Sequence, residues 1–217
     1  MKKIDLLSFV IALLFLASCN GKQSGTETAE EGEDMSSETT PAETTTMTVS
    51  TEESQIAWEG TMVGVYSHDG IVKLEEGSME VAGDEIVGGE FVVDLTTMTA
   101  TDENYNAEEG KTKEKLIGHL SSEDFFNVEQ YPTAKFVITS YDEANNSVSG
   151  DLTIRGNTHE ETVENVSFDS ESGKVTGTLT FDRTKYDVSF QAPAQDMVLS
   201  DDIELDIDLS LQPMGAA

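Results

Sequence analysis

Apolar and polar residues alternate along most of the chain after residue 54. A period of two predicts β-strands with one buried and one solvated face. The clearest run is 202–211, in which every second residue is Ile or Leu and most of the others are Asp or Glu. Shorter runs of the same kind, separated by Gly-rich or Asn-rich turns, predict further strands over residues 54–59, 70–81, 91–95, 134–140, 148–155, 161–169 and 175–182.

Helical periodicity is confined to the middle of the chain. Residues 108–120 predict one helix, because oppositely charged side chains lie four apart and the apolar residues near its end share one side. Either Ser121 or Ser122 suits the N-cap of a second short helix, whose first turn would be acidic. Pro132 ends that helix and directs the chain into an extended segment.

Many strands in series with one helical interruption predict an all-β fold, an up-and-down antiparallel β-barrel of about eight strands. A two-sheet sandwich is the alternative. The barrel domain is assigned to residues 54–211, a length sufficient for one core. A barrel of this size either fills with side chains or encloses one small ligand.

The positions predicted to face inward are almost entirely apolar. Ala134 and Gly177 among them are small and leave room for a cavity. A cavity of this kind would take a hydrocarbon chain, whereas a packed interior would leave a ligand-free interaction or stress-related module. The inward side chains proposed to contact a ligand are Trp58, Phe91, Phe136, Ile138, Leu152, Leu179, Phe181, Leu205 and Ile207.

The N-terminal segment is predicted to be a signal peptide spanning residues 1–18. Lys2 and Lys3 precede an apolar run at residues 6–16, which is too short to span a bilayer as a helix, and small residues precede Cys19. These features resemble a lipobox, which implies cleavage before Cys19 and its acylation. Ordinary secretion with an incidental cysteine is the alternative, but a lone cysteine cannot form an internal disulfide.

Residues 19–53 are predicted to be the acylated cysteine and a disordered acidic linker, because they are rich in Thr, Ser and Glu and poor in large apolar residues. Residues 212–217 are predicted to be a tail. Asn20 follows the cysteine in place of the Asp that retains lipoproteins at the inner membrane of many diderm bacteria. We therefore expect a cell-envelope location at the outer membrane, facing either the periplasm or the cell surface.

The chain is strongly acidic, with 43 Asp and Glu against 12 Lys and Arg and a net charge of −31. This charge argues against nucleic acid as a partner and against electrostatic docking on anionic lipid. The scarce Arg155 and Arg183 are predicted to form structural ion pairs with carboxylates. The acidic residues of the 202–208 run are predicted to form a solvated face rather than a calcium site, because strand spacing spreads them too far apart.

Signals for catalysis or a cofactor are absent from the sequence. It has no nucleophile elbow, phosphate loop or dinucleotide fingerprint, and its one cysteine is assigned to lipid. The three histidines lie on separate segments, so no metal site is predicted, and His159 lacks the second histidine of a zinc helix. His119 is expected to be a hydrogen-bonded structural residue. His68 is expected in a loop at the barrel mouth, where a ligand head group could pass.

Three blocks resemble the YceI-like family of bacterial lipid-binding proteins with a lipocalin-like barrel. Residues 119–136 read HLSSEDFFNVEQYPTAKF, residues 148–166 contain GDLTIRGN, and residues 181–188 read FDRTKYDV. The chain has Leu116-Ile117 where many members carry an Arg-Asp pair. The resemblance implies binding of an apolar lipid such as a polyisoprenoid. Together with the lipobox and the missing catalytic motifs, it predicts a non-catalytic protein that binds an isoprenoid or a fatty acyl chain and is held to a membrane by acyl chains. Storage, sequestration and transfer of the lipid remain alternatives, and a homodimer is left open.

Overall fold

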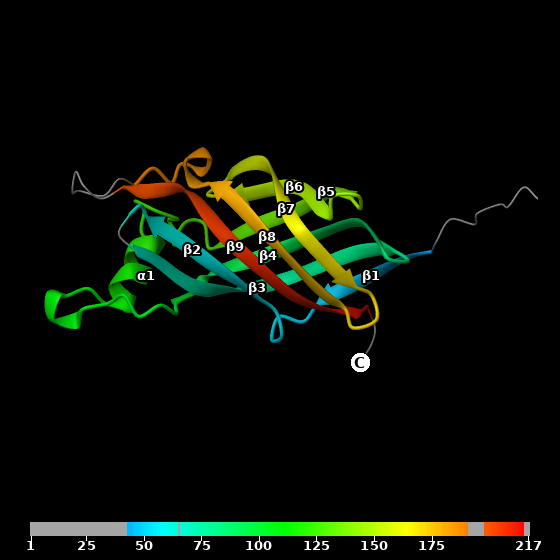
Figure 1. Cartoon of the computed structure of the whole chain (residues 1–217), viewed down its shortest axis with the longest axis horizontal. Coiled ribbons are helices and arrows are strands. Elements are labelled where there is room, and N and C mark those ends of the chain that lie inside the picture. The colour runs from blue at the N-terminus through cyan, green and yellow to red at the C-terminus, as the bar shows by residue number, and fades with distance from the viewer. Residues whose placement is uncertain (1–42, 65, 191–197, 215–217) are drawn as a thin grey trace, which may run out of the picture. The chain divides into compact units, whose positions relative to one another are not determined.

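The computed structural model describes residues 43–64, 66–190 and 198–214. These residues form nine strands, one α-helix and two short 3-10 helices. The strands are β1 (Thr44–Val49), β2 (Gln55–Met62), β3 (Tyr66–Ala82), β4 (Glu85–Ala100), β5 (Thr133–Asp142), β6 (Ser147–Ile154), β7 (Asn157–Asp169), β8 (Lys174–Asp182) and β9 (Leu199–Pro213). The helices are η1 (Ala107–Glu109), α1 (Lys113–Ser121) and η2 (Arg183–Tyr186), and α1 lies at one end of the sheet (Figure 1).

Strands β2 to β9 form a closed antiparallel barrel. Each pairs with the next strand in sequence, and β2 pairs with β9 to complete the ring. Figure 1 shows these strands winding around a common interior. The up-and-down barrel predicted from the period-two pattern is therefore confirmed, and the sandwich alternative was wrong because a ring of paired strands has no second sheet.

Tight turns connect several pairs of successive strands, at places where the sequence carries turn-forming residues. Arg155 and Gly156 form the two-residue link between β6 and β7, and both have positive φ, 51° and 79°. A type I′ hairpin turn requires positive φ at both central positions. Gly83, with a φ of 69°, turns the chain between β3 and β4. The register of these hairpins places the alternating apolar side chains on the inner face.

Strand β1 lies inside the segment that was predicted to be linker. It pairs with the end of β3, from Thr44 opposite Ala82 onward, and with the end of β9, from Met47 opposite Pro213 onward. It thereby lies between β3 and β9 beyond the first residue of β2. The prediction that residues 44–53 are linker, and that the barrel ends at residue 211, was wrong. The six residues TTTMTV read as polar, although Thr is favoured in strands and Met47 is buried.

The remaining N-terminal predictions, including the signal peptide, Cys19 and most of the linker, fall outside the described residues. Among the residues described, no helix has both the length and the apolar character needed to cross a membrane.

The helical connection between β4 and β5 differs from its prediction in two places. Gly110 has a φ of 70° and ends η1, so the predicted helix 108–120 is divided, and Thr112 accepts a hydrogen bond from the backbone N–H of Lys115 to cap α1. The second helix does not form. Ser122 is instead the C-cap of α1, its hydroxyl donating to the carbonyl of His119, and residues 123–126 form turns. These turns direct two phenylalanines into the barrel.

Candidate internal binding site

The barrel encloses an apolar cavity with two lobes. The larger lobe, of about 240 Å³, lies beside α1, and the smaller, of about 100 Å³, is lined by residues of β2 to β9 and by none of α1. The two lobes adjoin at five residues that line both, and this shared part of the wall is called the neck: Ile56, Val93, Ala134, Leu152 and Leu205. Burying some 400 Å² of ligand surface in such a space would contribute about 10 kcal/mol before the several kcal/mol lost on association are subtracted.

The nine side chains that the sequence suggested as ligand contacts all line this cavity. Trp58 and Phe181 line the larger lobe, whereas Leu152 and Leu205 line both. The other five line the smaller lobe and are Phe91, Phe136, Ile138, Leu179 and Ile207. The period-two pattern identifies inward positions on strands, which explains why it found the strand-borne part of the wall.

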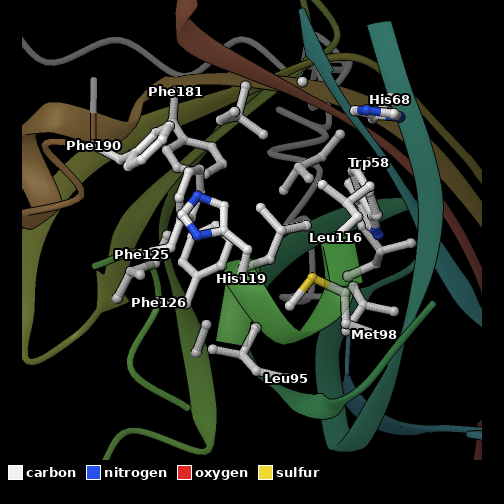
Figure 2. Close-up of a pocket in the computed structure, with 18 of the residues that line it drawn as sticks. Trp58, His68, Leu95, Met98, Leu116, His119, Phe125, Phe126, Phe181 and Phe190 are labelled. Carbon is white, nitrogen blue, oxygen red and sulfur yellow. The ribbon is translucent and has the colours of Figure 1, made fainter. Parts of the chain in front are cut away.

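The part of the wall that comes from α1 and the loops was missed. Figure 2 shows His119 and Leu116 projecting from α1 toward the interior, with Phe125 and Phe126 beside them and Phe190 opposite. The His119 ring packs edge-on against Phe190 at a centroid distance of 4.4 Å and against Phe125 at 5.7 Å. Helical and turn segments lack a period-two signal, so only the tertiary fold assigns these residues to the cavity.

Two polar atoms are buried in the cavity wall without a hydrogen-bond partner among the described residues. They are the indole Nε1 of Trp58 and the imidazole Nε2 of His119. The expectation that His119 is a hydrogen-bonded structural histidine was therefore wrong. Its neighbours in sequence resemble a structural motif, but its ring is surrounded by phenylalanine rings that offer no acceptor. A buried polar atom of this kind carries a desolvation cost unless a ligand or water pairs with it.

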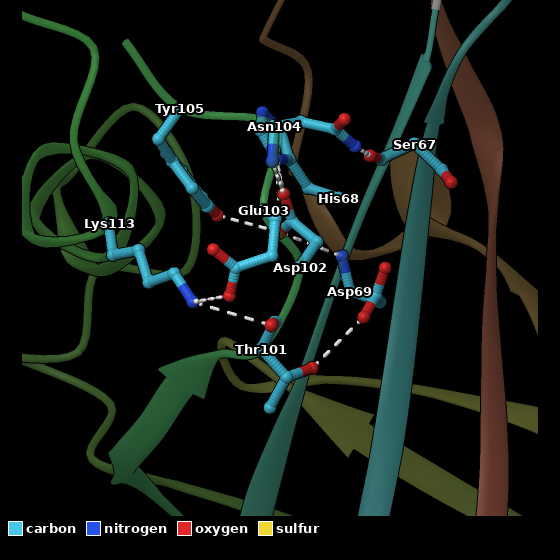
Figure 3. A network of polar contacts seen from close by, with 9 residues as sticks. All are labelled: Ser67, His68, Asp69, Thr101, Asp102, Glu103, Asn104, Tyr105 and Lys113. Atoms are coloured by element: carbon cyan, nitrogen blue, oxygen red, sulfur yellow. Dashed lines mark hydrogen bonds and ion pairs between the residues drawn. The ribbon is translucent and has the colours of Figure 1, made fainter. Parts of the chain in front are cut away.

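His68 lies in strand β3, not in the loop that was predicted, because β3 begins two residues before it. Its ring lines the larger lobe, stacks on Tyr105 at 5.2 Å, and places Nδ1 3.2 Å from both carboxylate oxygens of Asp102. Figure 3 shows this carboxylate at the centre of a polar network that joins the start of β3 to the segment after β4.

Asp102 is held by four groups. The Tyr105 hydroxyl donates at 2.7 Å, and the backbone N–H groups of Asn104 and Asp69 donate at 2.8 and 3.3 Å, in addition to the His68 contact. Burial by itself raises the pKa of the carboxyl, but the hydrogen bonds from Tyr105, Asn104 and His68 outweigh it and hold the Asp102 pKa below its ordinary value. The network therefore stabilises the folded state with Asp102 ionised.

An Asp102→Asn variant is expected to lose about 1.5 to 3 kcal/mol of stability at pH 7, since hydrogen bonds to a charged acceptor are lost. A depressed pKa in the folded state contributes stability above the ordinary Asp pKa, about 4, and that contribution disappears as the pH falls below it. The difference between wild type and variant should therefore shrink between pH 5 and pH 3, as measured by urea unfolding. Asp206→Asn, on the exposed face of β9, is the control, and an equal loss there would contradict the assignment.

The two arginines are both structural, but in different ways. Arg183 forms the predicted ion pair, with Nη2 2.9 Å from Asp201 Oδ1. Arg155 donates instead to the backbone carbonyls of Phe125 and Asp187. The prediction that Arg155 pairs with a carboxylate was wrong, because its place in a hairpin turn directs it toward main-chain acceptors of two neighbouring loops.

The acidic residues of β9 are exposed, as predicted for a solvated face. Asp202, Glu204, Asp206 and Asp208 all point outward, and Lys174 pairs with Asp208 at 3.2 Å. Within the described residues, no group of three or more His, Cys, Asp or Glu side chains is arranged to hold a metal ion.

Comparison with known proteins finds relatives of this chain both in sequence and in structure. Curated relatives named UPF0312 protein, from Staphylococcus epidermidis and Staphylococcus aureus, are 38% and 35% identical over 105 and 106 residues. Each match covers 45% of this chain and 60% of the relative, so the similarity spans less than two thirds of those proteins. The crystal structure of Burkholderia cenocepacia BcnA shares the fold, with a TM-score of 0.55, 16% identity, and coverage of 76% of this chain and 99% of that one.

A closed antiparallel barrel around an apolar cavity defines the chain as a barrel protein with a hollow apolar interior. Residues 47–211 match the model of the YceI-like domain, and the chain belongs to this family. The resemblance identified from three sequence blocks is thereby confirmed. The matched region begins within β1, in agreement with the corrected start of the barrel.

Proposed function

We propose that this protein binds a long apolar molecule, an isoprenoid or a fatty acyl chain, inside the barrel and does not transform it. The two-lobed apolar cavity carries this proposal. Among the described residues that line the larger lobe, only Trp58, Tyr66, His68 and His119 carry polar side-chain atoms, and none lines it with a carboxylate, lysine or arginine. A wall of this composition favours hydrocarbon and supports binding rather than chemistry on the ligand.

We also propose that the protein acts in the cell envelope, tethered by acyl chains on Cys19. The basic start, the short apolar run and the small residues before this cysteine support the anchor. Several acyl chains, at about 0.8 kcal/mol per buried CH₂, would hold it durably. The strongly acidic chain would not bind anionic lipid electrostatically. Attachment to a membrane would therefore depend on the acyl chains.

One experiment with two forms of the chain tests both proposals. The full chain and residues 20–217 are expressed with export signals in a diderm host, and each is fractionated into membrane and soluble pools. The full chain is expected with the membranes and the shorter form in the soluble pool. Recovery of the full chain in the soluble pool would contradict the anchor.

The soluble form is then purified without detergent and examined by native mass spectrometry. The cavity predicts one additional bound mass per chain that organic solvent releases and that is identified as a lipid. A protein that carries no such mass, and that takes up neither added isoprenoids nor added fatty acids, would rule out lipid binding. It would leave the packed interaction module as the better account.

A further inference from the structure

His119 brings a polar group into a wall that is otherwise almost entirely hydrocarbon. It lies in the last turn of α1, and its ring is held between the edges of Phe125 and Phe190. Figure 2 shows the ring among the phenylalanine side chains on one side of the cavity. Its Nε2 is buried and has no hydrogen-bond partner in the part of the chain that the structure describes. Packing against the phenylalanine rings holds the His119 ring in place, so its Nε2 is available to a molecule bound in the cavity.

Trp58 contributes a second buried nitrogen to the cavity wall. Its Nε1 is also buried without a partner among the described residues, and it lies on β2, across the larger lobe from α1. An indole N–H can only donate, whereas an imidazole nitrogen donates or accepts according to its tautomer. An oxygen atom satisfies either nitrogen. A pure hydrocarbon would satisfy neither and would leave both desolvation costs in place.

The cationic side chains near the cavity are already engaged. Arg155 bonds the carbonyls of Phe125 and Asp187, Arg183 bonds Asp201 and two carbonyls, and Lys135, which lines the smaller lobe, pairs with Glu90 at 2.8 Å. None of them lines the larger lobe. An anionic head group placed beside His119 would therefore be buried without a counter-charge, which is strongly unfavourable.

We propose that His119 Nε2 hydrogen-bonds an uncharged oxygen of the bound lipid, a hydroxyl or a carbonyl. The ligand is then a neutral oxygen-bearing lipid and not a phosphate ester or a bare hydrocarbon. This inference rests on the proposed function and specifies the chemical class of its ligand. The polar end lies in the larger lobe beside α1, and the apolar chain extends through the neck toward the smaller lobe.

Three ligands of equal chain length test the proposal with the delipidated form of residues 20–217, which contains every strand pairing of the barrel. Dodecane, dodecan-1-ol and dodecyl phosphate each compete with the apolar fluorophore N-phenyl-1-naphthylamine. Dodecan-1-ol is expected to bind about three- to tenfold more tightly than dodecane, the gain of one net hydrogen bond, and dodecyl phosphate is expected to bind most weakly. In His119→Leu the advantage of the alcohol over the alkane should disappear.

Leu199→Ala is the control, because it changes the apolar wall of the same lobe but removes neither ring that packs on His119, and it should weaken alcohol and alkane by one common factor. If His119→Leu does not fold, ¹⁵N NMR of the wild type replaces it. The His119 Nε2 resonance should shift on adding dodecan-1-ol and not on adding dodecane.

The possible results separate the inference from the function on which it rests. Equal binding of alcohol and alkane by the wild type, or an alcohol advantage that survives in His119→Leu, would overturn the role of His119 and leave lipid binding intact. Tightest binding of dodecyl phosphate would overturn the uncharged head. Failure of all three ligands to displace the fluorophore would remove the proposed function and this inference together.

Discussion

An Ala134→Phe variant is expected to bind a sixteen-carbon alcohol about a hundredfold more weakly than the wild type. Ala134 is buried on β5 and belongs to the neck that lines both lobes, where its side chain is only a methyl group. A phenyl ring there would occupy the passage and exclude the end of a long chain from the smaller lobe. Exclusion of about four methylene groups at about 0.8 kcal/mol each accounts for the expected factor.

An eight-carbon alcohol should be affected far less, because it fits within the larger lobe. Displacement titrations with both alcohols measure the chain-length dependence directly. Val137→Phe adds the same ring to β5 at a residue that lines neither lobe, and it should leave both affinities near the wild-type values. Equal weakening of the long and the short alcohol by Ala134→Phe would contradict a two-lobed site joined at this neck.

Arg183→Met is expected to lower the free energy of unfolding by about 3 to 5 kcal/mol, since it removes several hydrogen bonds from a charged donor in a buried site. The arginine is only 3% exposed and directs its guanidinium to three acceptors. Nε donates to the carbonyl of Ser200 at 2.9 Å, Nη1 to the carbonyl of Val188 at 2.5 Å, and Nη2 to Asp201 at 2.9 Å. Methionine fills similar space but leaves two carbonyls without their donor.

Urea unfolding at pH 7 measures this loss. Lys174→Met is the control, because Lys174 lies on the preceding strand β8 and its ion pair with Asp208 is about half exposed, so it should cost less than about 1 kcal/mol. An Arg183 variant as stable as the Lys174 variant would show that the buried guanidinium is not what ties η2 to the start of β9.

Arg183 also illustrates how the Asp-Arg-Thr block contributes to the fold. Asp182 caps η2 by accepting from the backbone N–H and hydroxyl of Thr184, at 2.8 and 2.6 Å. These bonds orient the chain so that Arg183 and Tyr186 both turn inward, and Tyr186 is fully buried, with its hydroxyl 3.1 Å from Glu161. The Asp-Arg-Thr block, which was recognised by its resemblance to the family, thus combines the N-cap of η2 with a buried arginine that bonds to neighbouring segments.

The strands of the barrel and its inner face were predictable from the sequence. Alternation in the 202–211 run reports directly which side chains are buried, because strand geometry sends successive residues to opposite faces. The first strand of the barrel domain was harder to predict from the sequence. Strand β1 contains four threonines in six residues, and its two apolar positions are too few to distinguish it from the polar linker before it.

Only the tertiary structure could show the helical side of the cavity. His119, Phe125 and Phe190 come from a helix, a turn and a distant loop, and no local period relates them. The same holds for Asp102, whose partners lie on β3 and on the segment after β4. A period along the chain encodes which face of an element is apolar. It does not encode which elements meet, because that depends on closure of the ring. Closure turned an apolar strand face into a cavity wall, and in that wall the Nε2 of His119 has no hydrogen-bond partner among the described residues.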